Sequence, residues 1–150
     1  MIPSISNGHS SLPADDGFPN ESVFKLSAKI SHKTLSLGDT LTIKAWLKND
    51  SPVSYEIRTG LLRSGEEIVD ERICISFSRR GIPHANILGP AITTTFEANE
   101  TYSRTDTFVV TEEGVYILRI CVSFTISLED GAQRCYQIDL PDTRYAIKSA

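Results

Sequence analysis

Seven apolar side chains occupy every second position in the segment 115–128. A β-strand places alternate side chains on one face, whereas a helix with about 3.6 residues per turn would scatter them around its circumference. The seven are Tyr116, Leu118, Ile120, Val122, Phe124, Ile126 and Leu128. This segment therefore predicts a long strand with one face in a hydrophobic core.

The residues after this strand predict a hairpin whose loop length sets the register. Glu-Asp-Gly at 129–131 suits a three-residue loop, in which a type I turn is closed by a left-handed glycine. Such a loop pairs Phe124 with Tyr136, so that the apolar faces of both strands coincide. A two-residue loop would instead set Ile126 opposite Cys135, and the shorter loop is disfavoured for that reason.

Alternating or apolar segments elsewhere predict further strands, separated by turn sequences. The clearest are 24–30 and 41–47, and the others are 53–62, 68–77, 91–96 and 102–110. The segment 79–90 contains Gly and Pro at four positions and is predicted to be a loop.

These segments together predict an all-β fold. Seven to nine short strands without an amphipathic helix are typical of a two-sheet antiparallel sandwich with Greek-key connections. Residues 1–22 are rich in Ser, Gly, Pro, Asn and Asp and are predicted to form a disordered tail or linker. The sandwich domain is expected to span residues 23–150.

Two stretches resemble immunoglobulin-like domains. The sequence GDTLTI at 38–43 is similar to the start of their second strand, and EEGVY at 112–116 is similar to the start of their sixth. The resemblance implies that the hydroxyl of Tyr116 bonds back to the backbone of this corner. Leu118 stands where antibody-type domains carry a cysteine, so the resemblance is to the disulfide-free members of the superfamily.

Two narrower resemblances rest on the last third of the chain. The segment 96–101, a strand, and then EGVY at 113–116 are faintly similar to bacterial intracellular proteinase-inhibitor domains. The same layout is faintly similar to the glycan-binding sandwich domains attached to polysaccharide transporters. These resemblances imply protease inhibition or glycan binding.

Charge and hydropathy exclude several partners. The chain carries 15 Lys and Arg against 19 Asp and Glu, a net charge of −4, and the signs are interspersed. A nucleic-acid partner is therefore not expected, and membrane insertion is not expected because no apolar run approaches about 20 residues.

Residues 1–20 lack the features of a secretory signal. This slightly favours the cytoplasm, although a mature secreted chain with an added Met would look the same.

The three cysteines, Cys74, Cys121 and Cys135, form an odd set without CxxC spacing, which indicates neither a metal knuckle nor a disulfide framework. The predicted hairpin separates Cys121 from Cys135 by about 13 Å along the strands, at roughly 3.3 Å per residue. A disulfide joins Cα atoms within about 7 Å. No bridge is expected between these two.

Residues for catalysis are scarce. The three histidines lie in separate segments, and neither a phosphate-binding glycine loop nor a GxSxG motif is present. We therefore expect no enzyme activity, no catalytic residue, no metal site and no cofactor. Acidic pairs in turns are solvated or, less commonly, bind calcium.

The N-x-S/T sequons at Asn20, Asn49 and Asn99 leave two interpretations open, glycosylation in a secreted chain or ordinary turn chemistry.

The candidate binding residues are Trp46, Arg79, Arg80 and His84. Trp46 alternates with core residues and is expected to point outward between two lysines, unless a loop or the tail covers it. The other three belong to the predicted 79–90 loop, and loops of a rigid sandwich commonly carry recognition. The first hypothesis is a non-catalytic protein–protein interaction module. The alternatives are a carbohydrate-binding sandwich and a protease inhibitor that acts through the 79–90 loop.

Overall fold

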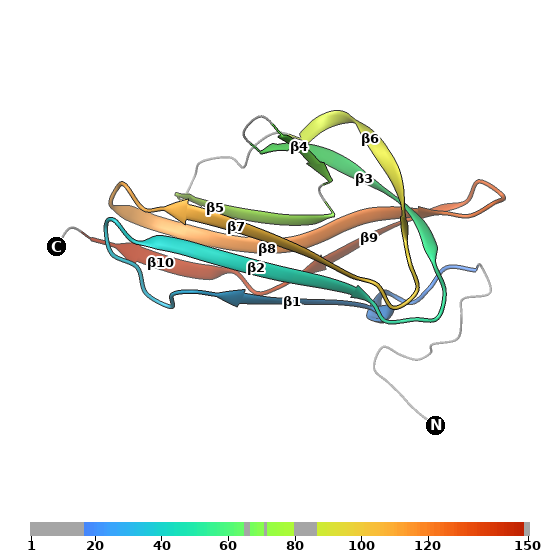
Figure 1. The fold of residues 1–150 in the computed structure, drawn as a ribbon, viewed down its shortest axis with the longest axis horizontal. Coiled ribbons are helices and arrows are strands. Elements are labelled where there is room, and N and C mark those ends of the chain that lie inside the picture. The colour runs from blue at the N-terminus through green and yellow to red at the C-terminus, as the bar shows by residue number, and fades with distance from the viewer. Residues whose placement is uncertain (1–16, 65–66, 71, 80–86, 149–150) are drawn as a thin grey trace, which may run out of the picture.

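The fold is taken from a computed structural model that describes residues 17–64, 67–70, 72–79 and 87–148. These residues form a short 3-10 helix, η1 (Glu21–Val23), and ten strands (Figure 1). The strands are β1 (Phe24–Ile30), β2 (Thr40–Asn49), β3 (Tyr55–Ser64), β4 (Glu67–Asp70), β5 (Ile73–Arg79), β6 (Ile87–Phe96), β7 (Thr101–Val109), β8 (Gly114–Ser127), β9 (Gln133–Asp139) and β10 (Thr143–Ile147).

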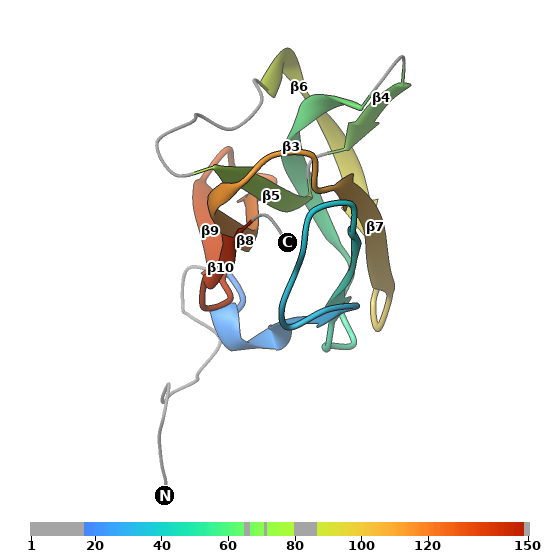
Figure 2. The ribbon, with the colours of Figure 1, turned by 90° about the vertical axis from the view of Figure 1, so that its left-hand side faces the viewer.

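The strands form two antiparallel sheets. The three-stranded sheet has the order β1-β2-β7. In the seven-stranded sheet the order is β10-β8-β3-β4, with β5 and β9 also paired to β8 and β6 paired to β3. Figure 2 shows the sandwich from one end, with β8, β9 and β10 on one side and β7 on the other. The predicted all-β fold of two antiparallel sheets is confirmed.

The core lies between the sheets and follows the alternation of the sequence. In β2 the inward side chains Leu41, Ile43, Ala45 and Leu47 are all 0% exposed. In β8 every second residue from Leu118 to Ile126 is likewise buried. Burial of one aliphatic side chain of this size stabilises the fold by about 1.5–3 kcal/mol, so these two strands supply much of the driving force.

An aromatic cluster joins the two sheets at one end. The ring of Phe24, from β1, lies 5.0 Å from that of Phe124, 5.5 Å from Tyr136 and 5.9 Å from both Tyr55 and Phe96. Most of these contacts are edge-to-face, the arrangement that aromatic quadrupoles favour. The cluster therefore fixes the edge strand β1 against the larger sheet.

The β8–β9 hairpin has the predicted three-residue loop. Phe124 pairs with Tyr136, and the amide of Leu128 donates a 2.9 Å hydrogen bond to the carbonyl of Ala132. Gly131 has φ 90°, the left-handed conformation in which a glycine is favoured. The register predicted from the matching of the apolar faces is confirmed.

The predicted tyrosine corner is also present. The Tyr116 hydroxyl donates a 2.9 Å hydrogen bond to the carbonyl of Glu112, four residues earlier. At the start of β2, Asp39 closes a turn by accepting a 2.8 Å hydrogen bond from the Ser36 amide. Both stretches that resemble immunoglobulin-like domains therefore have the expected local structure.

The segment 68–77, predicted to be one strand, is two strands in the structure. β4 pairs with β3, whereas β5 pairs with β8. Between them lies Arg72, only 4% exposed, with its guanidinium 5.0 Å from the Phe96 ring and 4.3 Å from the Tyr102 ring. The prediction failed because hydrophobic alternation cannot reveal that an arginine is buried between two aromatic rings.

The predicted 79–90 loop is too long at its C-terminal end. β6 already begins at Ile87 and includes Gly89 and Pro90. The register with β3 shifts between Thr59 and Leu61, which places an irregularity opposite this Gly-Pro pair. Proline is tolerated at such a bulge, where a ladder hydrogen bond is already missing. Residues 80–86 lie outside the described residues.

The chain after the hairpin continues along the same side of β8. β9 pairs with the second half of β8 and β10 with its first half, in registers that differ by one residue. Pro141 lies in the gap between the two strands. β10 was not predicted, and together with the division of 68–77 it brings the described strands to ten.

Part of the predicted tail lies against the sandwich. Phe18 is 5% exposed and belongs to the core. The Tyr136 hydroxyl donates a 2.7 Å hydrogen bond to the carbonyl of Pro19. Residues 1–16 of the predicted tail lie outside the described residues.

Candidate functional site

The outer face of the three-stranded sheet carries the one tryptophan of the sequence. Because Ala45 and Leu47 point into the core, alternation along β2 directs Lys44, Trp46 and Lys48 outward. Trp46 is half-buried, and both lysines are exposed. The predicted outward orientation of Trp46 is therefore confirmed.

Strand pairing adds two more lysines around this tryptophan. In the β1–β2 register, Lys48 lies directly opposite Lys25, and Lys44 directly opposite Lys29. Trp46 lies between the two lysine pairs, with Ser27 of β1 on one side and Ser103 of β7 on the other. We call Lys25, Lys29, Lys44, Trp46 and Lys48 the lysine–tryptophan face.

Carboxylates are absent from the outward positions of β1, β2 and β7. The other outward residues are Ser27, Thr40, Thr42, Thr101, Ser103, Thr105, Thr107 and Val109. Asp106 of β7 points inward and pairs with Arg104 at 3.0 Å. Asp50, just beyond β2, lies 3.6 Å from the Lys48 ammonium. The face is therefore locally basic although the whole chain is acidic.

Each lysine pair places two positive charges opposite each other in the free protein. Directly opposed like charges destabilise a sheet, and here two such pairs share one face. The pairs are four residues apart along each strand, or about 13 Å at roughly 3.3 Å per residue. An anionic ligand bound near each pair would relieve this repulsion.

One lysine also contacts the tryptophan ring. The ammonium of Lys44 lies 5.4 Å from the ring centroid of Trp46, within the range of a cation–π contact. The contact holds the indole beside the positive charge. It also places a side chain over part of the surface on which a sugar ring would stack.

Arg79 lies apart from this face. It ends β5 in the other sheet, beside the tyrosine corner, and its guanidinium is 3.8 Å from the carboxylate of Glu112. Arg80 and His84 lie outside the described residues, as does most of the loop proposed for protease inhibition. The described structure therefore does not bring the predicted binding residues together.

Sequence reasoning missed Lys25 and Lys29 as members of the face. Their alternation with core residues did indicate that they point outward. What it did not indicate was the strand beside them. The register between 24–30 and 40–49 was needed to place them next to Trp46.

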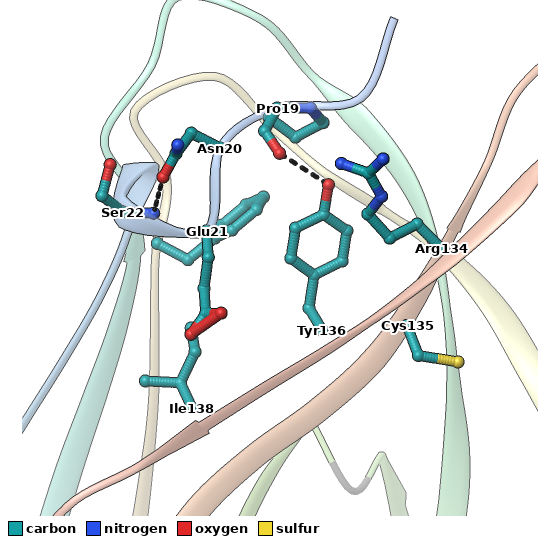
Figure 3. A pocket seen from close by; sticks show the side chains of 9 residues that line it. Pro19, Asn20, Glu21, Ser22, Arg134, Cys135, Tyr136 and Ile138 are labelled. Carbon is teal, nitrogen blue, oxygen red and sulfur yellow. Dashed lines mark hydrogen bonds between the residues drawn. The ribbon is translucent and has the colours of Figure 1, made fainter. Parts of the chain in front are cut away.

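A hollow of about 590 Å³ lies between the N-terminal segment and β9 (Figure 3). Its lining includes Asn20, Glu21, Arg134 and Tyr136. The Tyr136 hydroxyl is bonded to Pro19, and the Asn20 side chain accepts a hydrogen bond from the Ser22 amide. These polar groups serve the attachment of the N-terminal segment, so we do not assign a ligand to this hollow.

A serine and a histidine in contact at the end of β1 are part of the strand connection. The Ser31 hydroxyl lies 2.8 Å from the Nδ1 of His32 and also accepts a hydrogen bond from the Thr42 amide. Both residues are exposed.

Within the described ranges, no three His, Cys, Asp or Glu side chains are grouped to hold a metal ion. None of the helical structure described there has the length and apolar character of a bilayer span.

The three sequons differ in structure. Asn49 is 0% exposed, and its Nδ2 donates hydrogen bonds to the carbonyls of Val53, Phe96 and Glu97. This nitrogen is inaccessible to glycosylation in the folded domain. Asn20 caps η1, and Asn99 is exposed in a turn with φ 60°. Asn20 and Asn99 therefore occupy the cap and turn positions that the turn interpretation expects.

Comparison with known proteins gives structural likenesses only. No protein-family model matches the sequence, and no curated protein matches it. The ASH/PapD-like domain 7 of human CEP192 is 13% identical, with a TM-score of 0.43 over 99% of both chains. Spo0M, a sporulation control protein from Bacillus subtilis, is 8% identical, with a TM-score of 0.34 over 85% of this chain.

A mutant β-glucosidase from Listeria innocua in complex with laminaribiose is 14% identical, with a TM-score of 0.35 over 79% of this chain. This chain spans 50% of the Spo0M chain and 16% of the β-glucosidase chain. At these identities and TM-scores the likenesses concern the architecture and not the function. They confirm neither of the two narrower resemblances seen in the sequence.

Proposed function

We propose that this domain is a non-catalytic protein-interaction module that binds an acidic segment of another protein on the lysine–tryptophan face. The observation that carries the proposal is the arrangement itself, two cross-strand lysine pairs on either side of Trp46 without an outward carboxylate on the three strands. Opposite charges on this face and on its partner would orient the two proteins as they approach and would raise the association rate constant.

The tryptophan supplies the apolar part of the contact. Trp is enriched among residues that dominate binding energy, because its large ring buries much area at little cost in side-chain entropy. Trp46 is already half-buried and held beside Lys44, so little freedom remains to be lost on binding. We expect an apolar side chain of the partner to pack against this ring.

The spacing of the lysine pairs indicates the form of the segment. Two acidic side chains four residues apart in an extended chain are separated by about 13 Å, the same distance as the lysine pairs. One carboxylate would then lie near Lys25 and Lys48, and the other near Lys29 and Lys44. The apolar residue midway between them would contact Trp46.

The test uses the fluorescence of Trp46, the one tryptophan of the chain. The probe is a short synthetic peptide in which two glutamates lie four positions apart on either side of a leucine. Its control is a peptide of the same composition with the glutamates adjacent. We expect the first peptide to shift the emission and to bind more tightly, and we expect high salt to weaken it.

A matched pair of variants tests the face. The double variant Lys29→Glu, Lys44→Glu should bind the peptide at least about tenfold more weakly, a change of ~1.4 kcal/mol. The double variant Arg58→Glu, Arg144→Glu alters the net charge equally on the outer face of the other sheet and should bind normally. Equal affinity of both variants for the peptide would contradict the proposal.

A carbohydrate ligand is the second candidate, because Trp46 is surrounded by serine and threonine hydroxyls. It predicts that neutral oligosaccharides quench Trp46 emission, that binding is insensitive to salt, and that Trp46→Ala abolishes retention on a glycan array. Peptide binding that depends on the lysines, without retention on the array, would exclude this second candidate.

A further inference from the structure

Two cysteines far apart in the sequence are neighbours in the sheet. In the β5–β8 register Cys74 lies directly opposite Cys121. The residues on either side of each cysteine, Ile73 and Ile75 in β5 and Ile120 and Val122 in β8, are buried in the core. Both thiols therefore point to the same outer face of the seven-stranded sheet.

This placement satisfies the main geometric requirement of a disulfide. Directly opposed residues of antiparallel strands have Cα atoms about 4.5–5.5 Å apart. Disulfides join Cα atoms that are about 4.4–6.8 Å apart. Cys74 and Cys121, which are free cysteines in this structure, therefore meet the Cα requirement of a disulfide.

A small molecule can reach the two thiols. Both cysteines are half-buried and line a hollow of about 530 Å³ on the outer face, together with Ser76, Arg119 and Gln137. A hollow of this volume is in the range that holds small ligands. The thiols are neither sealed in the core nor fully exposed.

A positive charge lies beside one of the thiols. Arg119 is two residues from Cys121 on the same face of β8, and both side chains line the hollow. Arg119 also forms a 3.0 Å ion pair with Asp142. Asp139 of β9 lies directly opposite Cys121 and lines the same hollow, so charges of both signs flank the thiol. The thiolate is the form of cysteine that attacks a disulfide.

We propose that Cys74 and Cys121 form a dithiol site that undergoes exchange with low-molecular-weight disulfides and closes into a cross-strand disulfide. The Cys121 thiolate attacks one sulfur of the small disulfide, forms a mixed disulfide and releases one small thiolate. The Cys74 thiolate then attacks the Cys121 sulfur and releases the second. The protein loses two protons and two electrons, and the small disulfide is reduced to two thiols.

The third cysteine provides an internal control. Cys135 is exposed, and its sulfur lies 3.4 Å from the Thr125 hydroxyl on the opposing strand. Thr125 is four residues along β8 from Cys121, so about 13 Å separates the two cysteines along the strands. We therefore expect Cys135 to form a mixed disulfide with the small thiol and to react no further.

The experiment incubates the reduced, full-length protein with oxidised glutathione and follows it by intact mass and peptide mapping. The expected product has lost two hydrogens through a Cys74–Cys121 link and carries at most one glutathione, on Cys135. Three separate glutathione adducts, or a link from Cys135 to either other cysteine, would overturn the proposal.

Two variants test whether the reaction depends on the proximity of Cys74 and Cys121 or only on the reactivity of each thiol. In Cys121→Ser, Cys74 should retain glutathione as a stable adduct, whereas Cys135→Ser should still close the link. An aryl arsenoxide, which bridges two close thiols without oxidation, should bind the reduced wild type and Cys135→Ser but not Cys121→Ser. Arsenoxide binding equal in all three proteins would show that the thiols do not form a pair.

Discussion

The hydroxyl of Tyr136 donates a 2.7 Å hydrogen bond to the carbonyl of Pro19, and this bond attaches the N-terminal segment to β9 (Figure 3). Both residues are buried. A buried carbonyl that loses its donor costs about 1–3 kcal/mol. The contact is therefore a specific attachment point for the segment that leads into β1.

Tyr136→Phe should lower the free energy of unfolding by about 1–3 kcal/mol, because the Pro19 carbonyl loses this donor while the ring packing is kept. Urea unfolding measures the loss, and hydrogen exchange should become faster in residues 17–23. Tyr55→Phe is the matched control, since the ring of Tyr55 packs on Phe24 in the same cluster. Unchanged exchange in residues 17–23 would argue against this attachment.

Asn49→Asp should destabilise the domain by several kcal/mol at neutral pH. The buried Nδ2 of Asn49 faces three carbonyl oxygens, and an ionised carboxyl there would meet acceptors without a proton to offer. Protonation supplies a donor, so the penalty should shrink as the pH falls. Thermal unfolding between neutral and acidic pH measures the effect. Asn99→Asp, in an exposed turn, should have little effect, and an equal loss in both variants would contradict the prediction.

Lys29→Glu should stabilise the free domain while it weakens binding. The introduced carboxylate would lie directly opposite Lys44 and replace a like-charge pair with an opposite-charge pair, worth about 0.2–1 kcal/mol. Chemical unfolding at low salt measures the gain, which about 1 M salt should largely remove. Lys33→Glu, in the loop after β1, is the control. A lower stability of Lys29→Glu at low salt would refute the repulsion inferred for this face.

Tyr145 should make the domain sensitive to alkali. Burial raises the pKa of its phenol, and the hydroxyl donates a 2.7 Å hydrogen bond to the carbonyl of His32. Below the unfolded pKa of about 10 both states keep the proton, and the contribution is fully present. Above it the unfolded state releases the proton first, so stability falls as the pH rises through the folded pKa.

Tyr145→Phe should therefore lower stability near neutral pH by about 1 kcal/mol and flatten the loss above pH ~10, where one such group contributes at most about 1.4 kcal/mol per pH unit. Unfolding curves across this range test both effects. A variant whose stability still falls as steeply as that of the wild type would place the alkaline sensitivity elsewhere.

The sequence by itself determined most of the strands and, within them, which side chains point inward. The alternation along β8 specified its length, its buried face and, through the three-residue loop, its register with β9. The alternation along β2 directed Trp46 outward, and the resemblance of residues 112–116 to immunoglobulin-like domains indicated the corner in which Tyr116 bonds to Glu112. These features are local, because a period of two and a turn motif lie within one short segment.

Only the tertiary structure decided which strands lie side by side. Lys25 and Lys29 became part of one face with Trp46 through the β1–β2 register, and Cys74 came to lie opposite Cys121 through the β5–β8 register. The buried Arg72 divided a segment that alternation indicated as continuous. Alternation specifies inward or outward for each residue but not the neighbour across the sheet, because the pairing of distant strands depends on how the whole core packs.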